Sequence, residues 1–310
     1  MAVTLKGRDF ISLHDFTAEE IWQFLKTAEM LKLRQKAGLI DRPLEGKTLG
    51  MIFVKASTRT RIAFEVGMYQ LGGYPLFLSS NDLQLRRGET IPDTARVLSR
   101  YLDAIMIRTF AHSDVTELAA AADIPVINGL SDLLHPTQVL ADLLTIYEKK
   151  GHLEGIKLAY VGDGNNMAHS LMFGGAKTGL HVVIATPPNY RPNPDIIKTA
   201  TEDAAAHGAT IELTDDPFAA AKDADVIYTD VWASMGQEAE QQERIKHFQP
   251  YQVNAKLLAA AKRDAIFMHC LPAKRGLDVT DEVMDGPHSV VFDEAENRLH
   301  AHKAILISVM

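Results

Sequence analysis

The sequence predicts an α/β protein with two doubly wound domains, each a parallel sheet flanked by helices. Short apolar runs alternate with helical patterns along most of the chain, which is typical of parallel sheets with covering helices. The runs are almost continuously apolar, as expected for strands that are buried on both faces. The chain has 310 residues, enough for two domains that each have a core of their own.

The first domain is expected to span residues 1–150. An opening helix is predicted from Thr17, because Thr17-Ala18-Glu19-Glu20 has an N-cap residue followed by first-turn acids. Strands are then predicted at 51–54, 75–78, 104–107 and 125–127, with helices between them. A long helix from Pro136, with Gly151 just past its end, closes this half.

The second domain is expected to span residues 151–293 and repeats the alternation. Its strands are predicted at 157–161, 181–185, 210–213, 226–229 and 265–269. A final helix is predicted over about 294–310, and we expect it to pack back on the first domain. Ligands of such folds bind beyond the carboxyl ends of the strands, so polar residues at those ends are the candidates for a site.

Composition narrows the class of function. The formal net charge of −8 argues against a general nucleic-acid binder, which needs a basic surface. Cys270 is the single cysteine, so an internal disulfide is excluded and a cytoplasmic setting is expected. The first residues have no apolar signal core, and no run is long enough to span a membrane. We therefore expect a soluble protein with neither a nucleic-acid nor a membrane partner.

The run Ser57-Thr58-Arg59-Thr60-Arg61 stands where a predicted strand gives way to a predicted helix. The first N–H groups of a helix lack internal partners and point at whatever binds there. Hydroxyl groups and guanidinium groups add directional hydrogen bonds to a phosphate or carboxylate. The run therefore predicts an anion site, the alternative being an N-cap followed by solvated arginines.

Other strand ends of the first half also carry polar residues. Arg108 closes the strand predicted at 104–107, and His135-Pro136-Thr137-Gln138 opens the long helix. Gln138 lies about one helical turn after His135 and faces the same region. Each has a purely structural alternative, a solvated exit residue for Arg108 and helix capping for His135 and Gln138.

In the second half, Gly162-Asp163-Gly164-Asn165-Asn166 follows a predicted strand and resembles part of a dinucleotide-binding turn. The third glycine of that motif is missing, and the next strand lacks the acidic residue that a ribose requires. An NAD-dependent oxidoreductase is therefore a remote alternative. The amides of Asn165 and Asn166 instead suit a carboxylate.

Two further strand ends complete the set. Asp230-Val231-Trp232-Ala233-Ser234-Met235-Gly236 follows one strand, and His269-Cys270-Leu271-Pro272 follows another. A carboxylate with a nearby hydroxyl can hold and orient an ammonium group. A metal site is not expected, because no second cysteine or spaced histidine pair supplies further ligands. The alternative for Cys270 is a small core residue.

Together these motifs resemble the aspartate/ornithine carbamoyltransferase family over nearly the whole chain. Ser57-Thr58-Arg59-Thr60-Arg61 is similar to the family's carbamoyl-phosphate motif, and His135-Pro136-Thr137-Gln138 to its second motif. The motifs around Asp230 and Cys270 are similar to the ornithine branch. The resemblance implies that carbamoyl phosphate binds the first domain and L-ornithine the second, with the active site in the cleft between them. It implies neither a cofactor nor a metal.

The resemblance also implies individual roles. Catalytic roles fall to Arg108, His135, Asp230 and Cys270. Carbamoyl phosphate would contact Ser57, Thr58, Arg59, Thr60, Gln84, Arg108, His135, Gln138, Cys270, Leu271 and Arg298. Ornithine would contact Asn166, Asp230, Ser234 and Met235. Gln84 lies in a loop that in this family reaches a neighbouring subunit's site, so a homotrimer or a multiple of trimers is expected.

The implied reaction is transfer of a carbamoyl group to the δ-amine of ornithine, giving citrulline and phosphate. Other acceptors stay open, namely an N-acylated ornithine, putrescine or aspartate. A non-catalytic anion-binding protein is a further alternative, but it would not require Asp230 or Cys270. The sequence leaves open whether the enzyme serves arginine synthesis or ornithine catabolism.

Overall fold

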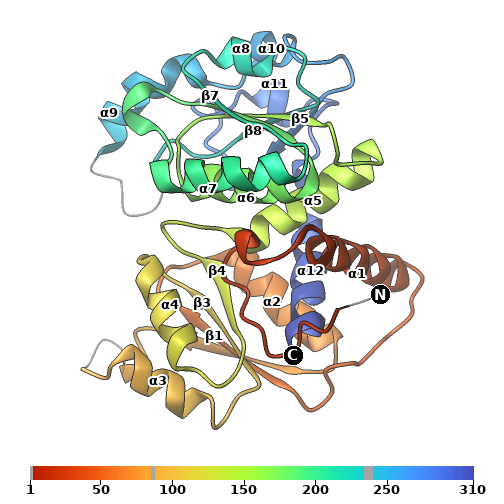
Figure 1. The fold of residues 1–310 in the computed structure, drawn as a ribbon, viewed down its shortest axis with the longest axis vertical. Coiled ribbons are helices and arrows are strands. Elements are labelled where there is room, and N and C mark those ends of the chain that lie inside the picture. The colour runs from red at the N-terminus through yellow and green to blue at the C-terminus, as the bar shows by residue number, and fades with distance from the viewer. Residues whose placement is uncertain (1–2, 85–87, 234–239) are drawn as a thin grey trace. The chain divides into compact units, whose positions relative to one another are not determined.

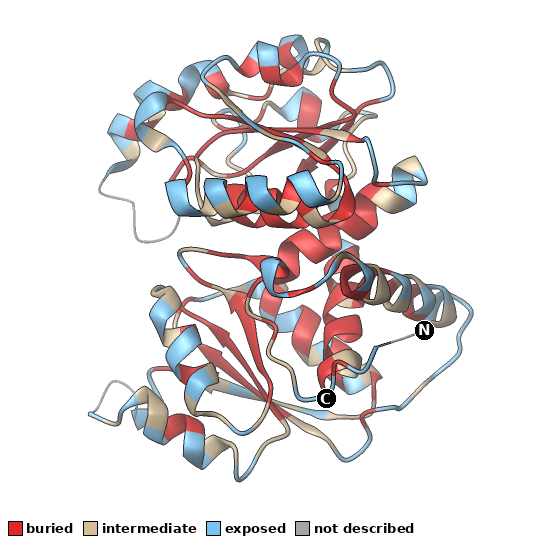
Figure 2. Ribbon diagram, in the orientation of Figure 1, coloured by how far each residue is buried: buried red, intermediate tan, exposed pale blue. Residues whose placement is uncertain are grey.

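The chain forms two compact units, each built around its own parallel sheet. A computed structural model describes residues 3–84, 88–233 and 240–310 (Figure 1). One unit comprises Met1–Leu144 with Glu296–Met310, and the other comprises Thr145–Ala295. Most strands of the two sheets are buried, whereas one edge strand of each sheet is partly exposed and most helices expose one side (Figure 2). Both sheets have helices on both faces, which confirms the predicted fold class.

The first sheet contains β1 (Thr48–Phe53), β2 (Tyr74–Ser79), β3 (Ala104–Arg108) and β4 (Val126–Leu130). Its order is β2-β1-β3-β4, and every pair is parallel. The chain leaves β1 for one edge of the sheet and returns to form β3 on the other side of β1. The carboxyl ends of β1 and β3 therefore form the switch point where ligands of doubly wound sheets bind.

Helices cover both faces of this sheet. Figure 1 shows α3 (Ile91–Leu98) and α4 (His112–Ala121) on one face, with α2 (Thr58–Gln70) and the C-terminal part of α12 (Val291–Val309) on the other. The helix α1 (Ala18–Lys36) begins at the expected cap, with a reciprocal capping box between Thr17 and Glu20. The remaining helix, α5 (Pro136–Lys150), starts at the predicted proline, and the boundaries between the units fall inside α5 and α12.

The second sheet contains β5 (Lys157–Val161), β6 (His181–Ala185), β7 (Ile211–Thr214), β8 (Val226–Thr229) and β9 (Ile266–His269). Its order is β7-β6-β5-β8-β9, again with parallel pairs only. The chain reverses direction across the sheet between β5 and β8, so their carboxyl ends form a second switch point.

The helices of this unit also lie on both faces (Figure 1). On one face are α6 (Asn166–Thr178) and α7 (Pro194–Ala206); on the other are α8 (Pro217–Ala221), α10 (Ala255–Leu258) and α11 (Asp281–Met284). A further helix, α9 (Gln241–Phe248), follows the segment after β8. Within the described residues, no helix is both long enough and apolar enough to cross a membrane.

Candidate active site

In the first unit, Ser57 is the N-cap of α2, directly after β1. Its side chain accepts a hydrogen bond from the main-chain N–H of Thr60, and the first turn of the helix contains no acidic residue. The positive end of α2 is therefore not neutralised by the helix's own side chains. This arrangement leaves the turn from Thr58 to Arg61 suited to an anion.

Two arginines from other elements converge on this turn. Arg298 of α12 donates to Thr60 Oγ1 at 2.6 Å, and Arg108 at the end of β3 donates to the same oxygen at 3.4 Å. Thr60, Arg108 and Arg298 are all buried. Because the Thr60 oxygen already accepts twice, its own proton is the group that it can offer to a ligand. The predicted residues Thr60, Arg108 and Arg298 are thus brought together.

The same basic cluster governs the protonation of His135, which is buried just before α5. Burial lowers the pKa of His135 well below its usual value, and the charges of Arg298, Arg108 and Arg59 lower it further. The imidazole is therefore neutral near pH 7 and can donate one N–H without adding a charge.

Gln138 is fully buried on the first turn of α5, and its amide has a defined orientation. Its Nε2 donates to Asp142 Oδ1 at 2.8 Å, one turn further along the helix. The oxygen of the amide is therefore the atom directed elsewhere, as an acceptor for an NH2 group. Sequence reasoning missed Asp142, although its spacing of four residues from Gln138 is a helical contact.

Two predicted residues of the first unit differ in setting from this cluster. Thr58 is exposed on the first turn of α2. Gln84 is exposed in the segment between β2 and α3, and its expected entry into a neighbouring subunit's site stays a prediction.

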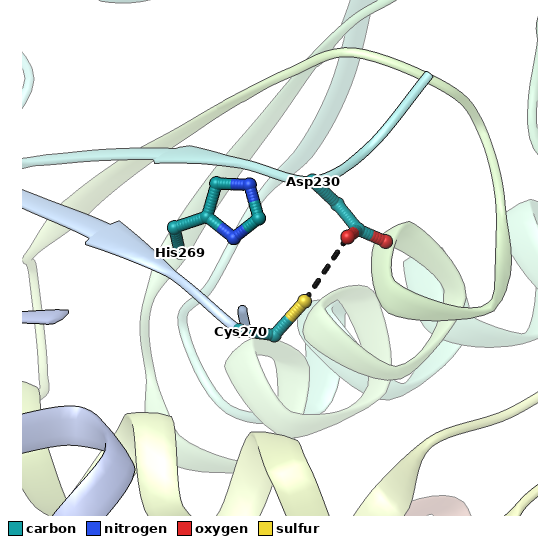
Figure 3. A group of neighbouring side chains, drawn as sticks. All are labelled: Asp230, His269 and Cys270. Atoms are coloured by element: carbon teal, nitrogen blue, oxygen red, sulfur yellow. Dashed lines mark hydrogen bonds between the residues drawn. The ribbon is translucent and has the colours of Figure 1, made fainter. Parts of the chain in front are cut away.

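In the second unit, three strand-end segments meet at Asp230, directly after β8. Its Oδ1 accepts from the main-chain N–H of Val231 at 2.7 Å and from the thiol of Cys270 at 3.1 Å. Its Oδ2 accepts from the side-chain amide of Asn165 at 2.8 Å. Figure 3 shows the carboxylate and the thiol directed toward each other from the ends of β8 and β9. The predicted residues Asp230 and Cys270 are therefore in direct contact.

His269 lies beside this pair, and both of its ring nitrogens are engaged. The ring's Nδ1 accepts from the main-chain N–H of Leu271 at 2.9 Å, so Nε2 carries the proton and donates to Asp278 at 2.8 Å. Leu271 has a φ of 57°, in the left-handed region that bulky residues rarely adopt. His269 thus fixes the backbone at Leu271, the residue whose carbonyl the resemblance assigns to the carbamoyl NH2.

The atoms of Asp230, His269 and Cys270 that could ligate a metal ion lie within 4.8 Å of one another, so we asked whether the three residues suit a metal site. A metal would need a lone pair of the His269 ring. The Nδ1 lone pair accepts from Leu271, and Nε2 carries a proton that is bonded to the buried Asp278. The three residues therefore fit a hydrogen-bonded cluster better than a metal site.

Gly164, in the turn after β5, has a role in the chain's own packing. A Cβ on Gly164 would lie 2.3–2.5 Å from main-chain atoms of residues 190–192, so only glycine allows that approach. The main chain that approaches this turn so closely is thus a loop of the same unit.

The residues predicted to contact ornithine include Asn166, which opens α6 and is half-buried. Ser234 and Met235, predicted to contact ornithine, lie outside the described residues.

A buried ion pair connects the segments that follow β5 and β8, the two strands at the switch point. Arg244 of α9 donates to Asp163 at 2.8 Å and to the carbonyl of Trp232 at 2.9 Å. Burial raises the pKa of Asp163 to about 6, against the opposing effect of Arg244. Sequence reasoning missed this pair, because its members are 81 residues apart and no local pattern indicates that they meet.

Two family models together match most of the chain. The model described as "Aspartate/ornithine carbamoyltransferase, carbamoyl-P binding domain" matches residues 8–148. The model described as "Aspartate/ornithine carbamoyltransferase, Asp/Orn binding domain" matches residues 154–309.

Individual proteins agree with these models. The chain is 64% identical over its whole length to the ornithine carbamoyltransferase of Thermococcus kodakarensis, of which it covers 98%. It is 63% identical, again over its whole length, to a Pyrococcus furiosus protein named "Ornithine carbamoyltransferase, anabolic", of which it covers 98%.

Solved structures of the same kind of protein are also similar to this chain. The ornithine carbamoyltransferase structure from Pyrococcus furiosus matches with a TM-score of 0.97 at 62% identity, covering 100% of this chain and 99% of that one. The structure of the anabolic enzyme from Campylobacter jejuni matches with a TM-score of 0.91 at 46% identity, covering 96% and 97%. The chain belongs to the aspartate/ornithine carbamoyltransferase family.

Proposed function

We propose that this chain transfers the carbamoyl group of carbamoyl phosphate to the δ-amine of L-ornithine, giving L-citrulline and phosphate. The observation that carries the proposal is the convergence of Arg108 and Arg298 on Thr60 at the N-terminus of α2. A hydroxyl proton, two guanidinium groups and a helix N-terminus together suit an acyl phosphate, in which the phosphate is bonded directly to a carbonyl carbon. The full-length identity to ornithine carbamoyltransferases supports the same assignment.

The first unit would hold carbamoyl phosphate. Ser57, Thr58, Arg59 and the helix N-terminus would bind the phosphate, and Thr60, Arg108 and His135 would donate to the carbonyl oxygen. These donors would stabilise the negative charge that develops on that oxygen, an effect worth about 3 kcal/mol for each donor. Gln138, oriented by Asp142, would accept from the carbamoyl NH2.

The second unit would hold ornithine. An alkylammonium group has a pKa of about 10.4, so the site must orient the minor neutral form of the amine. Asp230 and Cys270 are in contact with each other and would orient the δ-amine, while Asn166 would bind the amino-acid end. The nitrogen then bonds to the carbamoyl carbon, the bond from that carbon to the phosphate oxygen breaks, and the proton lost by the amine leaves with the phosphate.

An acceptor panel tests the assignment. With carbamoyl phosphate present, we expect citrulline from ornithine, and a kcat/KM at least about 100-fold lower for putrescine, N-acetylornithine and aspartate. A preference for any of these three compounds would contradict the assignment of ornithine as the acceptor and would indicate a carbamoyltransferase with a different acceptor. A requirement for NAD would point to the dehydrogenase alternative.

We also propose a cytoplasmic homotrimer or a multiple of trimers. Its support is the exposure of large apolar side chains on neighbouring elements of the first unit, namely Ile62, Val66 and Tyr69 of α2 and Tyr74 and Phe77 of the edge strand β2. Light scattering should give a mass that is a multiple of three chains; a monomer or a dimer would contradict the proposal. The expected position of the active site between the two domains stays a prediction.

A further inference from the structure

Asn165 is the N-cap of α6, and its side chain does more than cap the helix. Its Oδ1 accepts from the main-chain N–H groups of Met167 and Ala168, at 2.9 and 3.3 Å. The same oxygen accepts from the hydroxyl of Tyr160 at 3.2 Å. Its Nδ2 donates to Asp230 Oδ2 at 2.8 Å.

The helix fixes which way this amide faces. The first N–H groups of α6 need an acceptor, and only the oxygen of the amide can supply one. The NH2 group must therefore point the other way, across the switch point between β5 and β8, where Asp230 stands. The capping geometry of one element thereby directs a donor at a residue 65 positions away.

The Asp230 carboxylate is held by donors on both of its oxygens. Val231 and Cys270 donate to Oδ1, and Asn165 donates to Oδ2. Val231 and Cys270 both bond to Oδ1, so with these two donors alone the carboxylate could still turn about its Cβ–Cγ bond within the range of angles that the two hydrogen bonds tolerate. The Asn165 contact on the second oxygen sets the plane of the carboxylate.

We propose that Asn165 is a positioning residue for the acceptor amine, holding the plane of the Asp230 carboxylate so that the amine meets Asp230 and Cys270 in one orientation. This inference rests on the proposed function. Asn165 acts through Asp230 and needs no contact with either substrate. The ionisable groups around the carboxylate are His269 and Cys270 at the end of β9, Tyr160 on β5 and Asp163 after β5. His269 is bonded to Asp278, and Asp163 is paired with Arg244 of α9.

Two substitutions separate the donor role from the capping role. Asn165→Ser and Asn165→Asp both keep a good N-cap acceptor and lose the NH2 donor. We expect kcat/KM for ornithine to fall about 10- to 100-fold in both, the range for loss of one hydrogen bond to a charged group. Carbamoyl-phosphate affinity should stay within about twofold of the wild type, because the first unit is untouched.

The aspartate variant adds a second signature. It places a second carboxylate next to that of Asp230, and a nearby negative charge raises the pKa of an ionisable group. The acid limb of the pH profile of kcat/KM for ornithine should therefore move to higher pH by about one unit in Asn165→Asp, and not in Asn165→Ser. Alkylation of Cys270 by iodoacetamide should also slow in Asn165→Asp, because a nearby negative charge disfavours the thiolate. The single cysteine makes this readout unambiguous and independent of turnover.

Asn254→Asp is the matched control. Asn254 caps α10 in the same unit and accepts from the N–H of Leu257, without a bond to the Asp230 cluster. It should leave both the kinetics and the thiol reactivity unchanged. The inference is overturned if both Asn165 variants keep wild-type kcat/KM for ornithine, or if they lose carbamoyl-phosphate affinity to the same extent. Absence of citrulline with the wild type would instead overturn the proposed function, and the alkylation experiment would still test the Asn165 contact.

Discussion

At the scale of single residues, the second arginine of the motif after β1 has a different environment from the first. Arg61 is bonded to Glu65 at 2.9 Å and stacks over the ring of Phe77 at 3.7 Å. Arg59 lies close enough to the basic cluster to lower the pKa of His135. The guanidinium of Arg61 therefore lies on the surface of α2, whereas that of Arg59 lies near the anion site.

Arg59→Ala should abolish measurable carbamoyl-phosphate binding and leave the fold intact, because a charge-assisted contact to the phosphate is lost. Calorimetric titration measures the affinity. Arg61→Ala is the matched control from the same motif and should bind within about threefold of the wild type. Near-normal affinity in Arg59→Ala would show that Arg59 does not bind the phosphate.

Cys270→Ser should weaken the use of ornithine, by about tenfold in kcat/KM, because the shorter hydroxyl alters the contact to Asp230 Oδ1. The loss of carbamoyl-phosphate affinity should be far smaller than the loss in the use of ornithine. Steady-state kinetics with each substrate varied in turn, together with direct binding, separates the two effects. Equal losses for both substrates would return Cys270 to a packing role.

At the scale of elements, α2 and α12 pack in register along the first unit. Arg298 donates to Thr60, and one turn further along each helix His302 stacks on Phe64 with ring centroids 4.0 Å apart. His302 is fully buried, and neither of its ring nitrogens has a hydrogen-bond partner among the described residues. Burial, together with the charge of Arg298, lowers the pKa of His302 well below its usual value.

This packing predicts a pH effect on stability. The depressed pKa keeps His302 neutral in the folded chain, whereas an unfolded chain takes up a proton below about pH 6.5. The free energy of unfolding should therefore fall as the pH drops below about 6.5, by up to about 1.4 kcal/mol per pH unit for this residue. His302→Phe keeps the aromatic stack and removes the titration, so it should lose less stability on acidification.

Urea unfolding at pH 7.5, 6.5 and 5.5 compares the two proteins. His135 contributes in the same direction, while Asp163, with its pKa raised to about 6, loses its contribution as the pH rises through that value. Both residues are present in wild type and variant, so the difference between the two pH dependences isolates His302. Parallel curves for the two proteins would contradict the assignment.

The strands were the most predictable elements, because each is a short apolar run between clear helical patterns. Each of the nine predicted strands occurs among the described residues, with ends that differ from the prediction by at most a few residues. The strand orders were not predictable, since β3 pairs beside β1 and β8 beside β5 through contacts far apart in sequence. The final helix begins at Val291, one turn before the predicted Glu294.

The site was predictable where a side chain stands at a strand end, as Arg108 and Asp230 do. It was not predictable where one side chain orients another across the sheet. The amide of Asn165 and the carboxylate of Asp142 have ordinary local roles in a sequence, as a cap and as a helix residue. Their directing contacts, to Asp230 and to Gln138, follow from the packed structure.

At the scale of the whole molecule, the chain combines a net charge of −8 with a group of three arginines in one unit, of which Arg108 and Arg298 are buried and Arg59 is half-buried. An acidic protein with a local basic site can select a small dianion without binding nucleic acid. The other unit places a carboxylate and a thiol at its own switch point, chemistry that suits an amine. In the proposed reaction, the basic site of one unit would therefore bind the anionic substrate, and the carboxylate and thiol of the other unit would bind the amine.

Carbon-13 NMR with carbamoyl phosphate labelled at the carbonyl carbon tests the central claim most directly. With the wild-type chain and ornithine, the label should appear in the ureido carbon of citrulline at the rate at which phosphate appears. Release of phosphate with the label in carbonate rather than in citrulline would contradict carbamoyl transfer to ornithine.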